Sequence, residues 1–209
     1  MWDFFADDKD FRIPPELLDR NRSIFVAGLK LIGDGSVSGR TAWMNRPYPG
    51  TDGEYGISVC SDNLVESAVS FCRKNHCQLS MHAMGGRAIS RMIDRACREE
   101  KWTPEGIPYV RIEHATDPSD DSLKKAAGHG ISFVTQPIFL YAESKSYLSN
   151  LGQEWTRRCY PIRHILDEGV VLGFSTDAPA TFWAVPSDPF PGIKLAVTRT
   201  AADGTDCGR

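Results

Sequence analysis

The sequence predicts an α/β protein built around a parallel β-sheet. Between about residues 57 and 200, short apolar runs alternate with amphipathic stretches of helical length. The apolar runs are continuous and do not alternate apolar with polar residues, which is typical of parallel strands covered on both faces. Repeated units of this kind require crossover helices between neighbouring strands. A closed barrel and an open, doubly wound sheet both satisfy the pattern.

The chain opens with a polar lead-in at residues 1–22, and the first predicted strand is "SIFVAGLKLI", residues 23–32. A loop rich in Gly and Pro follows to about residue 56, and its length is typical of a functional excursion. Residues 61–76 are expected to form a helix, because Ser61 can cap its start and apolar residues then recur at helical spacing.

The same unit then repeats along the chain. Predicted strands at residues 78–82, 109–115, 131–136 and 170–177 alternate with predicted helices at 86–100, 119–130 and 161–169. A further section, residues 138–160, is expected to be polar and irregular, and together with the long loop to shape a substrate pocket. No internal repeat or linker interrupts the units, so residues 1–209 are expected to form a single domain.

Composition excludes several classes of protein. The 209 residues are 41% hydrophobic and 24% charged, which is ordinary for a soluble globular chain and unlike disordered or collagen-like sequences. The net charge of -3 is spread along the chain, so no nucleic-acid partner is expected. No run reaches membrane-spanning length and no secretion signal opens the chain. Six cysteines without a C-x-x-C pair favour reduced thiols in a cytoplasmic protein.

Chemically capable side chains fall at the ends of the predicted strands: His82, His114, Gln136 and Asp177. In parallel βα architectures these ends form the active-site edge. Taken alone, a histidine at a strand end is more often a hydrogen-bonded structural residue, and Asp177 could cap a turn. Two histidines and one aspartate at the same edge are the ligands of a divalent metal, usually zinc. The combination therefore predicts a metal site.

Lys30 interrupts the first apolar strand, where an uncompensated ammonium would carry a large desolvation cost. Its side chain either reaches solvent or pairs with Asp34, or it points to the active-site edge and is modified or paired there. The following "GDGSVSG", residues 33–39, is rich in glycine but matches neither nucleotide-binding pattern. Nucleotide binding is therefore not the preferred interpretation.

Six segments of the chain resemble the metal-dependent amidohydrolases, specifically amidohydrolase family 3, the YtcJ-like branch. They occur in the order of that family and span roughly residues 24 to 200. The segments are "GLKLIGDGSVSGRTA" (28–42), "PY" (47–48), "HAMGGRAI" (82–89), "RIEHA" (111–115), "STDAP" (175–179) and "LAVTR" (195–199).

The resemblance implies a (β/α)8 barrel of the TIM type, of which this chain would supply about strands four to eight. It implies that His82 and His114 bind a divalent metal, zinc first, with Lys30 as a carboxylated ligand. Asp177 would be both ligand and proton shuttle. The implied reaction is hydrolysis of a non-peptide C–N bond in a small amide-type substrate by metal-activated water. One metal ion and two are both left open.

The chain also departs from the family pattern. The family carries an His-x-His pair after its first strand, whereas no two histidines here stand two apart. Gly86 stands where relatives often have an acidic residue, and the chain ends at "TAADGTDCGR" before the usual final segment. A second hypothesis is therefore a catalytically incomplete, non-enzymatic barrel fragment that associates with itself or with a partner through open strand edges. A third is a Schiff-base enzyme using Lys30, which leaves His82, His114 and Asp177 without a role.

Overall fold

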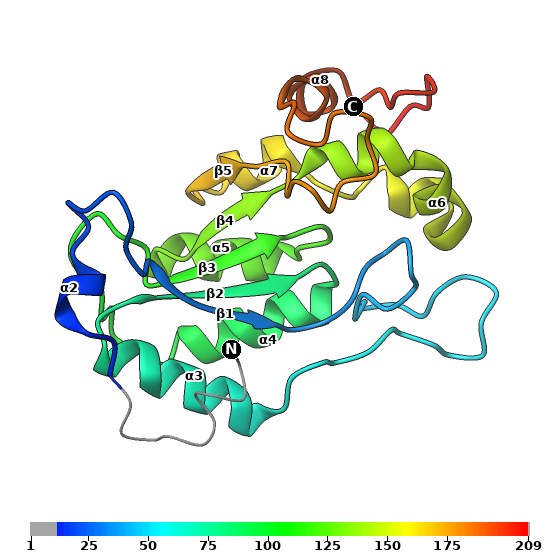
Figure 1. Ribbon diagram of the computed structural model, residues 1–209. Coiled ribbons are helices and arrows are strands. Elements are labelled where there is room, and N and C mark those ends of the chain that lie inside the picture. The colour runs from blue at the N-terminus through cyan, green and yellow to red at the C-terminus, as the bar shows by residue number, and fades with distance from the viewer. Residues whose placement is uncertain (1–11, 209) are drawn as a thin grey trace.

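A five-stranded parallel β-sheet forms the centre of the protein (Figure 1). The computed structural model describes residues 12–208. The strands lie in the order β1-β2-β3-β4-β5, and each pairs in parallel with the next. They are β1 (Gly28–Ile32), β2 (Gln78–Ala83), β3 (Val110–His114), β4 (Ser132–Thr135) and β5 (Leu172–Phe174). The predicted α/β class with parallel strands and crossover helices is confirmed.

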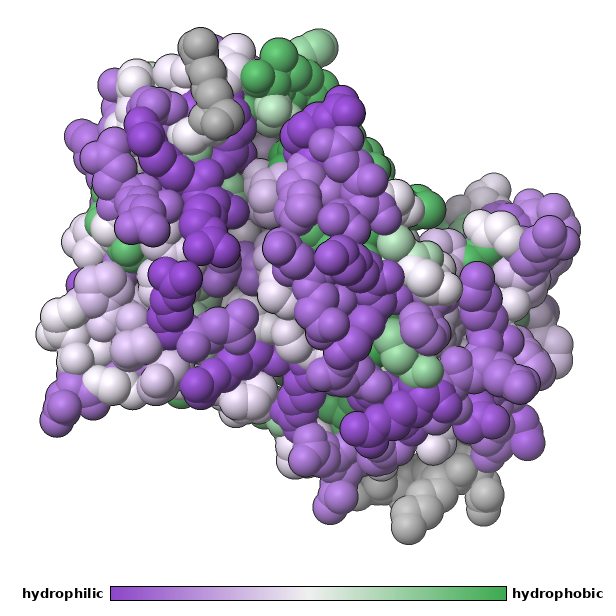
Figure 2. All heavy atoms as spheres, turned by 180° about the vertical axis from the view of Figure 1, so that it is seen from behind, coloured by the Kyte–Doolittle hydropathy of each residue, from purple (hydrophilic) through white to green (hydrophobic). Residues whose placement is uncertain are grey.

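One face of the sheet packs against α3 (Asp62–Lys74), α4 (Gly86–Ala96) and α5 (Asp120–His129). The strand residues on this face are fully buried, among them Leu31, Met81, Ile112 and Phe133. Polar residues cover the outside of the helices, and Figure 2, drawn from behind, shows a largely hydrophilic surface. The predicted cap at Ser61 is present, because its side chain accepts from a backbone N–H group at the start of α3, and Ser119 does the same at the start of α5.

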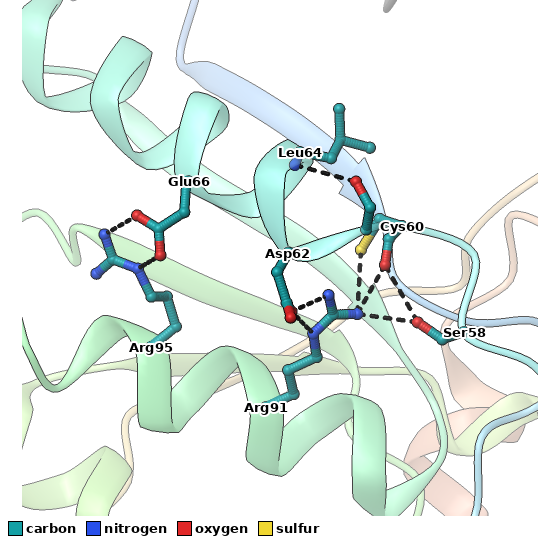
Figure 3. A network of polar contacts seen from close by, with 8 residues as sticks. Ser58, Cys60, Asp62, Leu64, Glu66, Arg91 and Arg95 are labelled. Carbon is teal, nitrogen blue, oxygen red and sulfur yellow. Dashed lines mark hydrogen bonds and ion pairs between the residues drawn. The ribbon is translucent and has the colours of Figure 1, made fainter.

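Helices α3 and α4 are joined by two arginine–carboxylate pairs (Figure 3). Arg91 binds Asp62 and Arg95 binds Glu66. Arg91 also donates to the Cys60 carbonyl at 2.7 Å. Because Arg91 contacts both the helix start and the chain before it, this side chain fixes where the long loop ends and α3 begins.

The opposite face of the sheet is polar at its centre and open at the β1 edge. The register places Lys30 beside Ser80 and Ile32 beside His82. Glu113 is buried and accepts from Ser80 at 2.7 Å. Lys30 is exposed, and Ile32 is 48% exposed. The prediction of a buried strand over residues 23–32 is therefore wrong in part. The strand is shorter, and only its helix-facing side is buried because β1 is an edge strand of the described sheet.

Helices α6 (Pro137–Thr156) and α8 (Phe190–Thr198) pack on each other at the carboxyl edge of the sheet, and α7 (Ile162–Asp167) lies between α6 and β5 in the chain. They build a second apolar cluster together with part of the long loop; its members include Val37, Met44, Tyr48, Leu140, Tyr147, Tyr160 and Leu195. The prediction that residues 138–160 are irregular is wrong. Pro137 opens a helix there, and non-helical backbone at Glu143 and Gly152 interrupts it.

Arg199 ties the end of the chain to the segment before α7. Its guanidinium donates to five backbone carbonyls, those of Arg157, Cys159, Tyr160, Cys207 and Gly208. Burial lowers the pKa of this guanidinium from its usual value. The side chain thus supplies hydrogen-bond donors to backbone carbonyls that lie outside the strands and helices. In this way it organises the second apolar cluster.

The remaining sequence predictions differ in detail. The strand expected over 170–177 ends at Phe174, so Asp177 lies beyond it in a loop. Of the predicted lead-in, residues 1–11 lie outside the described residues, and Pro15–Leu18 form the single turn α2. Across residues 12–208, every helix is too short or too polar to cross a lipid bilayer.

Candidate metal centre

A cavity of about 260 Å³ lies at the carboxyl edge of the sheet. It is enclosed by the long loop, the ends of β2 and β3, helix α6 and the loop after β5. Its lining residues are Ser36, Ser38, His82, Met84, His114, Phe139, Glu143, Tyr147, Asp177 and Ala180. The two segments expected to shape a pocket both contribute. The structure thus brings His82, His114 and Asp177 to one cavity.

The two histidines are direct neighbours. Their ring centroids are 4.3 Å apart with an interplanar angle of 62°. The ring of His114 stacks on Phe139 at 5.7 Å. Adjacent strands place them there, since β2 and β3 are paired and both residues lie at or near the strand end. Two imidazoles at this spacing can approach a common ion.

His114 is held as a neutral imidazole with one unpaired nitrogen. It is 3% exposed, and its Nδ1 is buried without a hydrogen-bond partner among the described residues. Burial lowers the pKa of His114 to about 3, with further contributions from His82 and the Lys30 ammonium, while Gln136 opposes the shift. A buried polar atom without a partner is unusual. A neutral nitrogen of this kind is what a metal ligand requires.

His82 is held differently. Its Nε2 lies 2.9 Å from the Gly35 carbonyl oxygen, and since a carbonyl only accepts, Nε2 carries the proton in this arrangement. The Nδ1 atom is then the nitrogen with a lone pair. A metal would bind His82 through Nδ1, or through Nε2 after that hydrogen bond opens. Such a bond to a backbone carbonyl is a common means of orienting a ligating histidine.

Asp34 is the residue at this site whose role the sequence did not reveal. It is 1% exposed and accepts from three backbone N–H groups. Its Oδ2 accepts from Trp43 at 2.8 Å and from Gly85 at 2.8 Å, and its Oδ1 accepts from Met84 at 3.0 Å. Burial raises the pKa of Asp34, and these hydrogen bonds and His82 oppose the rise. Asp34 therefore fixes the loop to the end of β2 and does not pair with Lys30.

Strained backbone occurs at two of the predicted ligands. His114 has φ 74° and Asp177 has φ 55°. Left-handed backbone is uncommon for residues other than glycine and costs of order 1–2 kcal/mol. Such strain clusters at functional sites, where the surrounding structure holds it in place. Both residues line the cavity.

The other predicted residues lie outside the cavity lining. Lys30 is on the same side of the sheet as His82 but two residue pairs further back along the strands. Gln136 precedes α6 and donates to Ser175 at 2.8 Å. Within residues 12–208, no group of three or more His, Cys, Asp or Glu side chains is already arranged around a common metal position. The cavity thus holds donors of the right chemistry without a closed ligand shell.

Gly86 has a steric explanation. A Cβ on Gly86 would lie 2.1 Å from Asn45 Nδ2 and 2.9 Å from the Asp117 carbonyl oxygen. Any larger side chain at this position would have to displace the Asn45 side chain and the backbone at Asp117. The acidic residue that the resemblance led us to expect here therefore has no room in this chain.

Comparison with known proteins places these features in context. The amidohydrolase family matches residues 9–209. "Putative amidohydrolase YtcJ" of Bacillus subtilis is 25% identical over 174 residues, which cover 83% of this chain and 32% of that protein.

Two archaeal crystal structures share the fold. A metal-dependent hydrolase from Pyrococcus horikoshii has a TM-score of 0.69 and 27% identity, covering 89% of this chain and 36% of that one. A metal-dependent hydrolase from Pyrococcus furiosus has a TM-score of 0.68 and 27% identity, covering 87% and 38%. The chain thus spans about a third of the length of the relatives it matches. Its five strands form part of a TIM-type barrel.

Proposed function

The chain belongs to the amidohydrolase family, and on that premise we propose that its cavity forms part of a metal-dependent hydrolase site for a non-peptide C–N bond. The substrate class is a small amide-type molecule. The observation that carries the proposal is that His82, His114 and Asp177 line one cavity. The YtcJ relative and the two archaeal hydrolases support the reaction class.

The donor set fits a divalent ion, with zinc as the first choice. Two imidazoles and a carboxylate are the usual protein ligands of a catalytic zinc site. The Nδ1 atom of His114 is available as a metal ligand, because it has no hydrogen-bond partner among the described residues. When bound, the ion would supply Lewis-acid activation of water and of the substrate carbonyl. Lys30 could join only as a carboxylate, because an ammonium has no lone pair for a cation.

The side chains of this chain would each perform a separate task. His114, kept neutral by burial, offers its nitrogen without first losing a proton. A carboxylate oxygen of Asp177 would take a proton from the attacking water and return it to the leaving nitrogen. Asp34 holds the end of β2 through Met84 and Gly85, so it fixes the direction of His82. The activity, substrate and cellular location of the whole protein are part of this proposal; the six free thiols favour the cytoplasm.

Metal analysis tests the proposal directly. The purified chain is dialysed against a zinc-containing buffer, freed of unbound ion and analysed by inductively coupled plasma mass spectrometry. We expect a stoichiometric ion, and its loss in the His82→Ala, His114→Ala double variant. The matched control is His129→Ala, His164→Ala, which removes two histidines outside the cavity.

Two outcomes would overturn the metal site. One is no retained ion in the unaltered chain, and the other is equal retention in the cavity variant and the control. Amide hydrolysis is measured on the same samples with a panel of N-acyl amines. Metal retention without hydrolysis would keep the site but reject catalysis by this chain.

A second candidate function is self-association, and the exposed edges of the sheet favour it. At the β1 edge Ile24 and Ile32 are 84% and 48% exposed, and at the β5 edge Val171 and Phe174 are 66% and 46% exposed. Open edges flanked by apolar side chains are sites of strand pairing. Size-exclusion chromatography with light scattering decides this point. A monomer over a wide concentration range rejects a homo-oligomer.

A further inference from the structure

Glu143 is a carboxylate of the cavity that the proposed hydrolysis does not use. It lies in α6, where the backbone departs from helical geometry with φ -116° and ψ 23°. The Ser38 hydroxyl, from the long loop, donates to Glu143 Oε2. Glu143 is thus held from two elements far apart in the sequence. The irregularity in the helix occurs at one of the three α6 residues that line the cavity, between Phe139 and Tyr147.

The cavity carries negative charge without a matching cation. Glu143 and Asp177 are both in its lining, and none of the ten lining residues is Lys or Arg. The Lys30 ammonium acts on His114 from nearby but is not part of the lining. The lining therefore favours a cationic ligand over an anionic one.

The rest of the lining supports a ligand with an apolar section. Met84, Phe139 and Tyr147 contribute apolar and aromatic surface to the same cavity. His114 lies in the same lining, and its Nδ1 is the atom assigned above to the metal. The cavity thus offers a nitrogen donor from β3, apolar walls, and an anchored carboxylate from α6.

We propose that Glu143, oriented by Ser38, binds a protonated amine of the substrate, so that the molecule to be cleaved is an amide carrying an ammonium group. The amide would lie toward the histidines and Asp177, and the ammonium toward α6. An ammonium donates up to three hydrogen bonds, and Glu143 can accept one while Ser38 occupies the other side of the carboxylate. The reaction part of this inference rests on the proposed function, whereas the binding part does not.

Isothermal titration calorimetry tests the binding part with three probes of similar size. They are N-acetylputrescine, which is cationic, N-pentylacetamide, which is neutral, and the N-acetyl derivative of γ-aminobutyrate, which is anionic. We expect the cationic probe to bind at least about tenfold more tightly than the neutral one, as one hydrogen bond to a charged group provides. The anionic probe should bind most weakly.

Two variants identify the responsible carboxylate. Glu143→Gln keeps an acceptor for Ser38 but removes the charge, and should abolish the preference for the cationic probe. Glu154→Gln removes the same charge from an exposed position of the same helix and should leave the preference intact. Ser38→Ala should reduce the preference and serves as the second variant if Glu143→Gln unfolds, which thermal melting reports.

Equal binding of the cationic and neutral probes, or a preference that survives Glu143→Gln, would overturn the inference. Titrations are run on chelator-treated and on zinc-loaded protein. A cation preference without retained zinc would support the amine site while the metal site failed. Retained zinc without a cation preference would support the metal site while the amine site failed. Failures of the two proposals are therefore distinguishable.

Discussion

Replacement of Asp34 should show that one buried carboxylate holds the candidate centre together. In Asp34→Ala, the N–H groups of Trp43, Met84 and Gly85 lose their common acceptor at distances of 2.8 to 3.0 Å. A buried donor left without a partner costs about 1–3 kcal/mol. Three such donors, partly relieved by water, give an expected loss of about 3–6 kcal/mol. That is a large share of the roughly 5–15 kcal/mol that keeps a domain folded.

Asp34→Asn should lose less stability than Asp34→Ala, and the hydrogen-bond geometry gives the size of the loss. The Oδ2 atom accepts two of the three hydrogen bonds and Oδ1 accepts the third. If the Asn carbonyl takes the Oδ2 position, two donors stay paired and its NH2 group meets the Met84 N–H. One orphaned donor predicts a loss of about 1–3 kcal/mol. We therefore expect the free energy of unfolding to be highest for the wild type, lower for Asp34→Asn and lowest for Asp34→Ala.

Urea unfolding followed by tryptophan fluorescence measures these differences. The matched control is Asp52→Ala, which removes an exposed aspartate from the same long loop and should stay within about 0.5 kcal/mol of wild type. Equal losses for Asn and Ala would refute the assignment of two hydrogen bonds to one oxygen. A loss below about 1 kcal/mol for Ala would refute the structural role of Asp34 altogether.

Three further predictions concern pH, the chain end and the α4 turn. The folded-state pKa of His114, about 3, lies below its usual value of about 6.5, so between them the unfolded chain binds a proton that the native chain does not. Metal-free protein should lose stability as the pH falls through this window, by up to about 1.4 kcal/mol per pH unit. The free energy of unfolding is measured with urea at several pH values, and the same pH dependence in His114→Gln as in the wild type would contradict this prediction. Arg199→Met should cost about 2–4 kcal/mol and speed hydrogen exchange at residues 157–160, and unaltered exchange there would reject its anchoring role. Gly86→Ala should lower the melting temperature, because its Cβ would meet a backbone carbonyl at 2.9 Å; a wild-type melting temperature would show that the turn yields.

The sequence predicted the sheet well where the signal is local. Continuous apolar runs identified all five strands, and a serine before an amphipathic stretch identified the start of α3. Helix α6 was missed for a physical reason. Its buried side includes polar residues such as Ser144 and Asn150, and two non-helical positions break its period. Asn150 is buried because it donates to the Val37 and Ser38 carbonyls of the distant loop, a contact that no local pattern contains.

The candidate site divides in the same way. The position of polar residues at strand ends predicted His82, His114 and Asp177 as neighbours. All three line one cavity, although β5 ends at Phe174 and Asp177 lies in the loop beyond it. Asp34 was considered only as a partner for Lys30, because its actual partners lie 9, 50 and 51 residues away. One local signal was present: an aspartate between two glycines directly after a strand can approach backbone N–H groups closely. Glu143 had no such signal, since only the folded α6 places it at the cavity.

The charge of Lys30 links the metal site to the substrate site. As an ammonium it helps lower the pKa of His114, and it would also repel a divalent ion approaching the histidines. Carboxylation would reverse its sign, favour the ion and raise the pKa of His114 again. A metal beside the histidines would in turn offset the negative charge of Asp177. Glu143 would then be the carboxylate of the lining whose charge the metal does not neutralise. The cation preference assigned to Glu143 should therefore persist when the metal binds, whereas a preference due to Asp177 should disappear.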